Sequence, residues 1–381
     1  MRALIPEFIA AQYEEGRYQG ELEATCLFLD VSGFTAMTGT LMEHGKAGAE
    51  QLSQIINRVF DPITDLIYRH GGFIATFAGD AFTAIFPTAD TTSVTAAAFA
   101  IRRVFDEQHL QRTPYGEFPI EGKMGIAFGS ASWGIVGGNA EEDRRNTFYF
   151  RGPALDAAAQ AEHHADPGEV IASAELRNTL ADSFPLEALA EDEEYIRVKP
   201  SKGDLQPSQD VRWKLAPAEE TQARFRPLEL LPSSTSGEFR ELTAVFIAFE
   251  DAEHHDAIAE LAQTTLPMVE DYGGYFDLLD FGDKGGVMLA LFGAPRSLGQ
   301  NAERAAAFAT ALTASLGQQV RIGVASGTVF AGYMGGSRRA TYTALGDTVN
   351  LAARIAMEAA PGAVELPADL AQSLGAQYQS S

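Results

Sequence analysis

LFLDVSGFT, the stretch at residues 27–35, joins an apolar run to an acidic residue, Asp30, and then to a turn that contains Gly33. The uninterrupted apolar run predicts a central strand that is covered on both faces. Gly33 lets the backbone approach a ligand closely, and the amides that follow begin a predicted helix, which is a suitable anion site. This stretch therefore predicts a strand that places a carboxylate beside a phosphate-binding turn.

The residues that follow alternate between helical and strand patterns. Apolar residues at helical spacing predict a helix over 51–70, which ends at Gly71 and Gly72. Two strands, 73–77 and 82–86, are joined by AGDA, a hairpin turn that carries Asp80. A helix over 91–106 and a strand over 123–128 complete the order of a ferredoxin-like α+β unit.

The second half of the chain repeats this order. A strand, a helix, a hairpin, a helix and a strand are predicted in turn at residues 242–249, 256–271, 275–292, 301–316 and 320–325. The segments KMGIAFGSASWGIVGG and RIGVASGTVFAGYMGG occupy corresponding places in the two halves, which indicates a duplication.

We therefore expect two α+β domains, at residues 1–215 and 239–381, joined by a linker at 216–238 that contains three prolines and the run SSTSG. After GAV at Gly362 the second copy has 17 further residues, where the first copy continues for about 45 after GEV. Either the second domain is abbreviated or the chain is a fragment of a longer protein.

Each copy lacks polar groups that the other copy keeps. The first copy has Asp30 and Asp80, and the second has Asn350 and Arg354, four positions apart and hence on one face of a predicted helix. In the second copy, the positions that correspond to Asp30 and Asp80 are Ala248 and Gly286. In the first copy, the positions that correspond to Asn350 and Arg354 are Asp156 and Gln160. Such complementary loss predicts one composite site that both halves build.

The composition restricts the partners. A net charge of -24 disfavours nucleic acid and anionic membrane surfaces, and no apolar run approaches the ~20 residues that span a bilayer. The single cysteine, Cys26, excludes an intrachain disulfide, so a cytoplasmic, reducing location is expected.

Asp30 and Asp80 offer the hard oxygen ligands that Mg²⁺ prefers, and beside an anion-binding turn they favour a nucleoside triphosphate.

LFLDVSGFT, FAGDAF and TALGDTVNLAAR resemble the catalytic domain of class III adenylyl and guanylyl cyclases, from about residue 23 to 366 apart from the linker. The tandem arrangement resembles the soluble adenylyl cyclase branch. The resemblance implies that the two domains associate head to tail as a pseudo-heterodimer within one chain. It also implies two sites at their interface, one of them active, and further effector domains beyond this chain are possible.

The resemblance also implies roles for individual residues. Two Mg²⁺ or Mn²⁺ ions would be held by Asp30, Asp80 and the Val31 carbonyl. The triphosphate would be bound by residues of the turn and by one lysine, namely Ser32, Gly33, Phe34, Thr35 and Lys123. Asn350 would orient the ribose, and Arg354 would stabilise charge on the α-phosphoryl group.

The base-recognition positions depart from the adenine-specific pattern. Leu278 stands where adenine-specific members have a lysine, while Thr343, at the second base-reading position, matches the soluble branch. Loss of the lysine removes a donor to the purine edge and weakens selection of adenine. The resemblance as a whole implies conversion of ATP to 3′,5′-cyclic AMP and pyrophosphate. The base-recognition positions alone leave the choice between ATP and GTP open.

Three alternatives stay open from the sequence. The first is an inactive nucleotide-binding pseudocyclase with a regulatory role, and the second is a cyclase with relaxed or GTP specificity. The third is pairing of the second domain with another chain. The second interface site, without its metal and transition-state residues, should be catalytically dead. Thr76 and Ala159 stand uncharged where the soluble branch binds bicarbonate, so bicarbonate activation is not expected.

Overall fold

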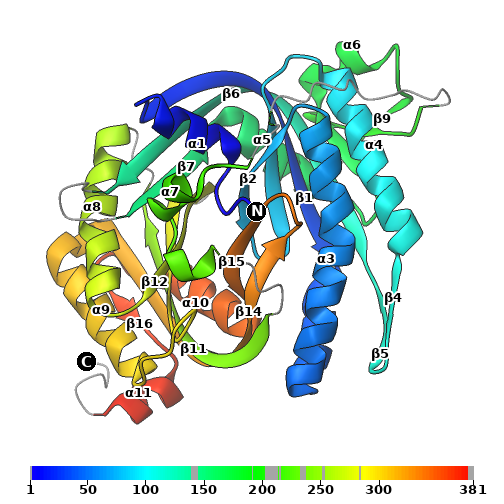
Figure 1. Cartoon of the computed structure of the whole chain (residues 1–381). Coiled ribbons are helices and arrows are strands. Elements are labelled where there is room, and N and C mark those ends of the chain that lie inside the picture. The colour runs from blue at the N-terminus through cyan, green and yellow to red at the C-terminus, as the bar shows by residue number, and fades with distance from the viewer. Residues whose placement is uncertain are drawn as a thin grey trace.

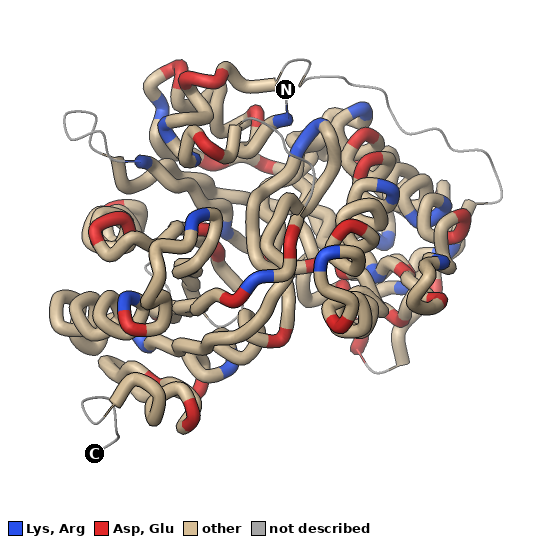
Figure 2. The backbone as a smooth tube through the Cα atoms, turned by 60° about the horizontal axis from the view of Figure 1, so that its bottom comes forward, with Lys and Arg blue, Asp and Glu red and all other residues tan. Residues whose placement is uncertain are grey.

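The computed structural model describes residues 2–138, 145–190, 192–201, 213, 216–231, 237–250, 254–282 and 285–375. It is an α+β protein with two large antiparallel-rich sheets, one in each half of the chain, and helices packed around them (Figure 1). Acidic and basic residues are interspersed over both halves (Figure 2). Within the described residues, no helix has the length and apolar character needed to cross a membrane.

The first sheet has the strand order β2-β3-β1-β6-β8-β10-β9, with β7 paired to β6. The first half of the chain comprises α1 (Glu7–Glu14), β1 (Gln19–Ser32), α2 (Phe34–Met42), α3 (Gly45–Arg69), β2 (Phe73–Ala78), β3 (Ala81–Phe86), α4 (Thr91–Gln108), β4 (Leu110–Thr113), β5 (Gly116–Pro119), β6 (Glu121–Gly137), β7 (Asn146–Arg151), α5 (Pro153–His163), β8 (Val170–Ser173), α6 (Arg177–Leu180), β9 (Leu186–Ala188) and β10 (Tyr195–Val198). Within it, β4 and β5 pair with each other as a separate two-stranded sheet.

The second sheet has the order β12-β13-β11-β14-β15, with β16 paired to β14. A connecting region that contains α7 (Glu219–Ala223) leads to the second half of the chain. The second half comprises β11 (Glu238–Phe249), α8 (His255–Asp271), β12 (Tyr275–Gly282), β13 (Gly285–Phe292), α9 (Asn301–Leu316), β14 (Val320–Gly335), β15 (Ala340–Leu345), α10 (Asp347–Glu358), β16 (Val364–Glu365) and α11 (Ala368–Leu374).

The predicted duplication is confirmed down to one irregularity of the backbone. β2 and β3 pair with a register shift between Ile74 and Thr76, and β12 and β13 pair with the same shift between Phe276 and Leu278. Because a bulge inserts one residue into a strand, its repetition fixes which positions correspond in the two hairpins. Thr76 therefore corresponds to Leu278.

The long strands β6 and β14 extend well past their predicted ends at residues 128 and 325. Their final residues leave the parent half and enter the opposite one. Phe330 and Met334 at the end of β14 belong to the hydrophobic core of the first half. Val136 at the end of β6, with Tyr149 on β7, belongs to the core of the second half. The two halves therefore fold as partners that share core residues.

The N-terminal residues and the connecting region pack against the second half. Ala3 forms a β-bridge with Arg339, and the Leu4 amide donates to the Gln222 side chain at 2.7 Å. Gln222 is fully buried on α7, within the range that composition predicts to be a linker. The prolines of residues 216–238 indicated a connection between the two halves. They gave no sign that α7, within this connection, packs against the N-terminal residues.

Arg339 is buried at the junction of these segments, with a side chain that is 1% exposed. Its guanidinium lies 5.5 Å from the ring centre of Phe77. Burial lowers the pKa of Arg339 to about 10, while Tyr68 and Glu7 oppose that shift. Burial raises the pKa of Glu7, which Tyr68 and the Arg339 charge oppose. The cluster thus joins α1 and α3 of the first half to the second half.

We predict that Arg339→Met destabilises the protein by about 1–3 kcal/mol, because it removes a buried charge that interacts with Glu7 and with the Phe77 ring, and leaves Arg338 as the one remaining cation that opposes the raised pKa of Glu7. Urea unfolding followed by circular dichroism measures this change. Arg69→Met is the matched control, since the ion pair of Arg69 with Asp65 lies at the surface and should contribute little. Equal unfolding midpoints for the two variants would contradict a stabilising role for the cluster.

Candidate nucleotide site

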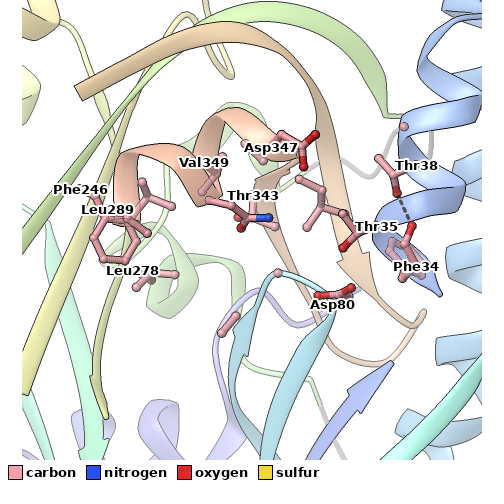
Figure 3. A pocket seen from close by; sticks show the side chains of 18 of the residues that line it. Phe34, Thr35, Thr38, Asp80, Phe246, Leu278, Leu289, Thr343, Asp347 and Val349 are labelled. Carbon is pink, nitrogen blue, oxygen red and sulfur yellow. Dashed lines mark hydrogen bonds between the residues drawn. The ribbon is translucent and has the colours of Figure 1, made fainter. Parts of the chain in front are cut away.

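A pocket of about 270 Å³ lies between the two halves, near the lower end of the size range of small-molecule sites. The first half contributes α2 and the turn between β2 and β3. The second half contributes β12, β13, the end of β15 and the start of α10. Figure 3 shows Thr35 and Asp80 at one end of this pocket, and Phe246, Leu278 and Leu289 at the other.

Two carboxylates lie together at the first-half end of the pocket. Asp30 stands near the end of β1, and Asp80 occupies the β2–β3 turn, as predicted. Burial, and next the charge of Asp30, raise the pKa of Asp80 to about 6, while a hydrogen bond with the Thr35 side chain opposes the shift. Neighbouring carboxylates of this kind suit a divalent cation, whose charge removes their repulsion.

Lys123 lies beside this pair, because β6 places it directly across from Asp30 on β1. The Lys123 Nζ is 3.5 Å from the Asp30 Oδ2 and 2.6 Å from the Glu162 Oε1. Burial lowers the pKa of Lys123, but Glu162 and Asp30 together raise it overall. Glu162 is a buried residue of α5 that the sequence analysis did not identify, since only the packing of α5 on the sheet brings it there.

The predicted phosphate turn has the expected backbone. Gly33 adopts φ 89°, in the left-handed region, and a Cβ there would lie 2.3 Å from the Pro119 carbonyl oxygen. α2 begins at Phe34, whose buried ring packs edge-on against Phe60 at 6.4 Å. Thr35 is exposed. Only glycine fits position 33, so the turn that presents the first amides of α2 depends on it.

Thr343 and Leu278, the two predicted base-recognition residues, both line the pocket. The Thr343 hydroxyl donates to the Asp277 Oδ2 at 2.6 Å, so it offers only acceptor capacity to a ligand. Burial raises the pKa of Asp277 to about 6, and the Thr343 bond and the Arg226 charge oppose the shift. The Arg226 Nη1 also donates to the Asp277 carbonyl oxygen at 2.8 Å.

Two acidic residues near Leu278 and Thr343 were missed from the sequence, although a signal was present. FDLLDFG places Asp277 and Asp280 inside an otherwise apolar strand, and Asp280 lines the pocket. A charged side chain in a buried strand is unfavourable unless it has a partner or a function. An acidic residue that interrupts an apolar strand therefore indicates a candidate site residue.

Asn350 lines the pocket from the first turn of α10. Arg354 lies one turn further along the helix and is exposed, outside the set of lining residues. Of the predicted site residues, the pocket wall includes Phe34, Thr35, Asp80, Leu278, Thr343 and Asn350. Asp30 and Lys123 adjoin it through the contacts above. The roles of all these residues, and of Val31, Ser32, Gly33 and Arg354, stay predictions.

The corresponding region on the other side of the interface is occupied by aromatic side chains. A Cβ on Gly286, at the place of Asp80, would lie 2.1 Å from the Phe249 ring. Tyr149 pairs with Gly134 as Thr343 pairs with Gly332, and the Tyr149 ring packs against Phe281 at 5.3 Å. Gln160, at the place of Arg354, accepts a hydrogen bond from the Tyr195 hydroxyl at 3.0 Å. This arrangement has no pair of carboxylates at the positions of Asp30 and Asp80.

Two homologous α+β halves with a pocket between them define the fold of class III nucleotidyl cyclases. The chain belongs to the adenylate and guanylate cyclase catalytic domain family, whose model matches residues 17–207 and 285–381. This confirms the family resemblance and the fold predicted from the sequence.

Individual relatives agree with this family. Adenylate cyclase type 10 of Rattus norvegicus is 27% identical over 88% of this chain, and the Homo sapiens protein is 25% identical over 90%. The chain spans 24% of the length of each. A class III adenylyl cyclase-like ATP-binding protein from Pseudomonas aeruginosa has the same fold, with a TM-score of 0.62 and 13% identity over 93% of this chain and 85% of its own.

We predict that Thr343→Val destabilises the protein by about 1–3 kcal/mol, because Asp277 loses its buried donor. Asp277 has its pKa raised from 3.8 to about 6, so its burial costs stability above pH 6 and ceases to do so below pH 3.8. The effect of the substitution should therefore be larger at pH 7.5 than at about pH 4.

Urea unfolding at both pH values measures the difference. Thr343→Ser is the control, since it keeps the hydroxyl and should remain close to the native protein at either pH. A loss of stability that is the same at the two pH values would show that the hydrogen bond to the Asp277 carboxylate is not its cause.

Proposed function

We propose that this protein is an adenylyl cyclase that converts ATP to 3′,5′-cyclic AMP and pyrophosphate. The observation that carries the proposal is the composite pocket, in which Asp80 and Thr35 of the first half face Thr343 and Asn350 of the second. Membership in the cyclase family and the similarity to adenylate cyclase type 10 support the nucleotide chemistry. In this reaction the ribose 3′-oxygen attacks the α-phosphorus, its proton is released, and pyrophosphate leaves.

Asp30 and Asp80, with the Val31 carbonyl, fit a pair of Mg²⁺ or Mn²⁺ ions. Such ions would lower the pKa of the 3′-hydroxyl and neutralise the triphosphate. Ser32, Gly33 and the first amides of α2 bind phosphate oxygens at the turn. Lys123, held by Glu162, places a positive charge beside the terminal phosphate.

The second half orients the reacting groups. Asn350, on the pocket wall, holds the ribose so that its 3′-oxygen is aligned with the α-phosphorus. Arg354 is on the same helix and reaches the α-phosphoryl group with its long side chain, where it stabilises the charge of the transition state. Catalysis therefore requires both halves, and we propose that they pair within one chain.

A cyclase with relaxed or GTP specificity is a second candidate, and Leu278 favours it. An apolar side chain at this place donates no hydrogen bond to the adenine edge, so the wall formed with Phe246 and Leu289 accepts either purine.

A nucleotide-binding pseudocyclase would keep the pocket and lack turnover. We place the activity in intracellular signalling in the cytoplasm, where further effector domains would adjoin this catalytic region.

We predict that Asp30→Asn lowers formation of cyclic nucleotide by about 100-fold or more, because the metal pair loses a charged ligand of nearly equal shape. Product analysis by mass spectrometry, with ATP or GTP and with Mg²⁺ or Mn²⁺, measures the change. Asp106→Asn is the matched control, since Asp106 is an exposed residue of α4 that pairs with Arg102 far from the pocket. Absence of product from the native protein under all four conditions would refute the enzyme in favour of the pseudocyclase.

We further predict that a mixture of Asp30→Asn and Arg354→Ala proteins stays inactive. If the site forms within one chain, each variant lacks an essential group in its only productive pocket. Pairing between chains would instead create a pocket with both groups intact and restore activity. Recovery of activity that rises with total protein concentration would therefore contradict intramolecular pairing.

A further inference from the structure

Asp280 is a carboxylate in the pocket wall whose purpose the proposed reaction leaves unassigned. It lies two residues after Leu278 on β12, so both side chains project from the same face of the strand. Their cross-strand neighbours on β13 are Val287 and Leu289, which also line the pocket. Asp280 therefore interrupts a wall that is otherwise apolar.

The fold itself does not require an acid at this place. Counted from the shared bulge, Asp280 corresponds to Ala78 in the first hairpin, where a methyl group suffices. The described residues include no side chain that forms a hydrogen bond or ion pair with the Asp280 carboxylate. Burial raises its pKa to about 7, and the Phe281 amide opposes the shift. Among the described residues, the Phe281 amide is thus the one group that stabilises the Asp280 charge, and a buried acid with so little compensation indicates a ligand-binding role.

Its position separates it from the metal end. The charge that raises the pKa of Asp80 is that of Asp30, and no charged neighbour contributes to the shift of Asp280. Figure 3 shows Leu278 well away from Asp80, at the end of the pocket that also holds Leu289. The carboxylate is thus placed to meet the base of a nucleotide.

We propose that Asp280 reads the edge of the purine base by accepting hydrogen bonds from its ring N–H and amino groups, and so tilts selection toward guanine. The inference rests on the proposed nucleotide binding, and it favours the second candidate, a cyclase with relaxed or GTP specificity, over a strict adenylyl cyclase. An ionised carboxylate only accepts hydrogen bonds, through two oxygens. Guanine presents N1–H and the 2-amino group side by side and matches both oxygens, whereas adenine presents its 6-amino group beside the acceptor N1. Leu278 cannot form hydrogen bonds with this edge of the base, so Asp280 is the neighbouring group on β12 that can.

Binding of 3′-deoxy-ATP and 3′-deoxy-GTP with Mg²⁺, measured by calorimetry, tests this assignment without turnover, since neither nucleotide can cyclise. Asp280→Asn should lower the affinity for 3′-deoxy-GTP relative to 3′-deoxy-ATP by about 10-fold or more, because it removes a charge-assisted pair of hydrogen bonds. Asp347→Asn alters the exposed carboxylate at the start of α10 and should affect both nucleotides alike.

The native protein provides a second measurement. Ionisation of Asp280 as the pH rises from 6 to 8 should increase the affinity ratio of the guanine to the adenine nucleotide, since the protonated acid donates to adenine N1 instead. Among the described lining residues, the other ionisable groups are Asp80 in the β2–β3 turn and Asp347 on α10, and α2, β11, β13 and β15 contribute none. Asp280→Asn should remove this change of ratio with pH.

The outcomes separate the two proposals. A ratio in Asp280→Asn within about twofold of the native ratio overturns the assignment of Asp280 and leaves the cyclase intact. A shifted ratio in a protein that forms no cyclic product supports Asp280 and removes the enzymatic activity. Failure of the native protein to bind either nucleotide overturns both.

Discussion

The exchange of strand ends between the two hydrophobic cores is the constraint on which the remaining structure depends. Phe330 and Met334 complete the core of the first half, and Val136 and Tyr149 complete that of the second. Separation of the halves would expose these apolar side chains, at a cost of about 1.5–3 kcal/mol for each large one. The shared core residues therefore hold together the two halves that line the pocket.

Close approach at these strand ends depends on glycine. A Cβ on Gly335 would lie 2.8 Å from the Phe77 ring, and one on Gly336 would lie 2.8 Å from the Asp61 carboxylate. The Gly-Gly pair at the end of β14 thus serves the interface, because a side chain there would hold β14 away from the first half. Arg339 follows within the same turn and adds buried charge to the contact.

The two sides of this pseudo-symmetric interface have diverged in opposite directions. One side keeps carboxylates, hydroxyls and a cavity, and on the other the rings of Tyr149 and Phe249 both pack against Phe281. Buried acids such as Asp80, Asp277 and Asp280 reduce stability through dehydration, as their raised pKa values show. Aromatic packing on the other side contributes stability without that cost. The polar side is therefore where the structure tolerates unfavourable groups, as functional sites do.

The sequence by itself determined the duplicated α+β architecture, because strand and helix periods and paired glycines are local signals that recur in order. It also identified the Asp30 and Asp80 pair and the position of Asn350, since these follow short motifs at element ends. Only the tertiary structure decided the partners of these groups. Glu162 reaches Lys123 through helix packing, Asp277 reaches Thr343 across the sheet, and Asp280 enters the pocket through a bulge and a strand register. Such contacts join residues far apart in the chain, and their geometry arises when the elements pack.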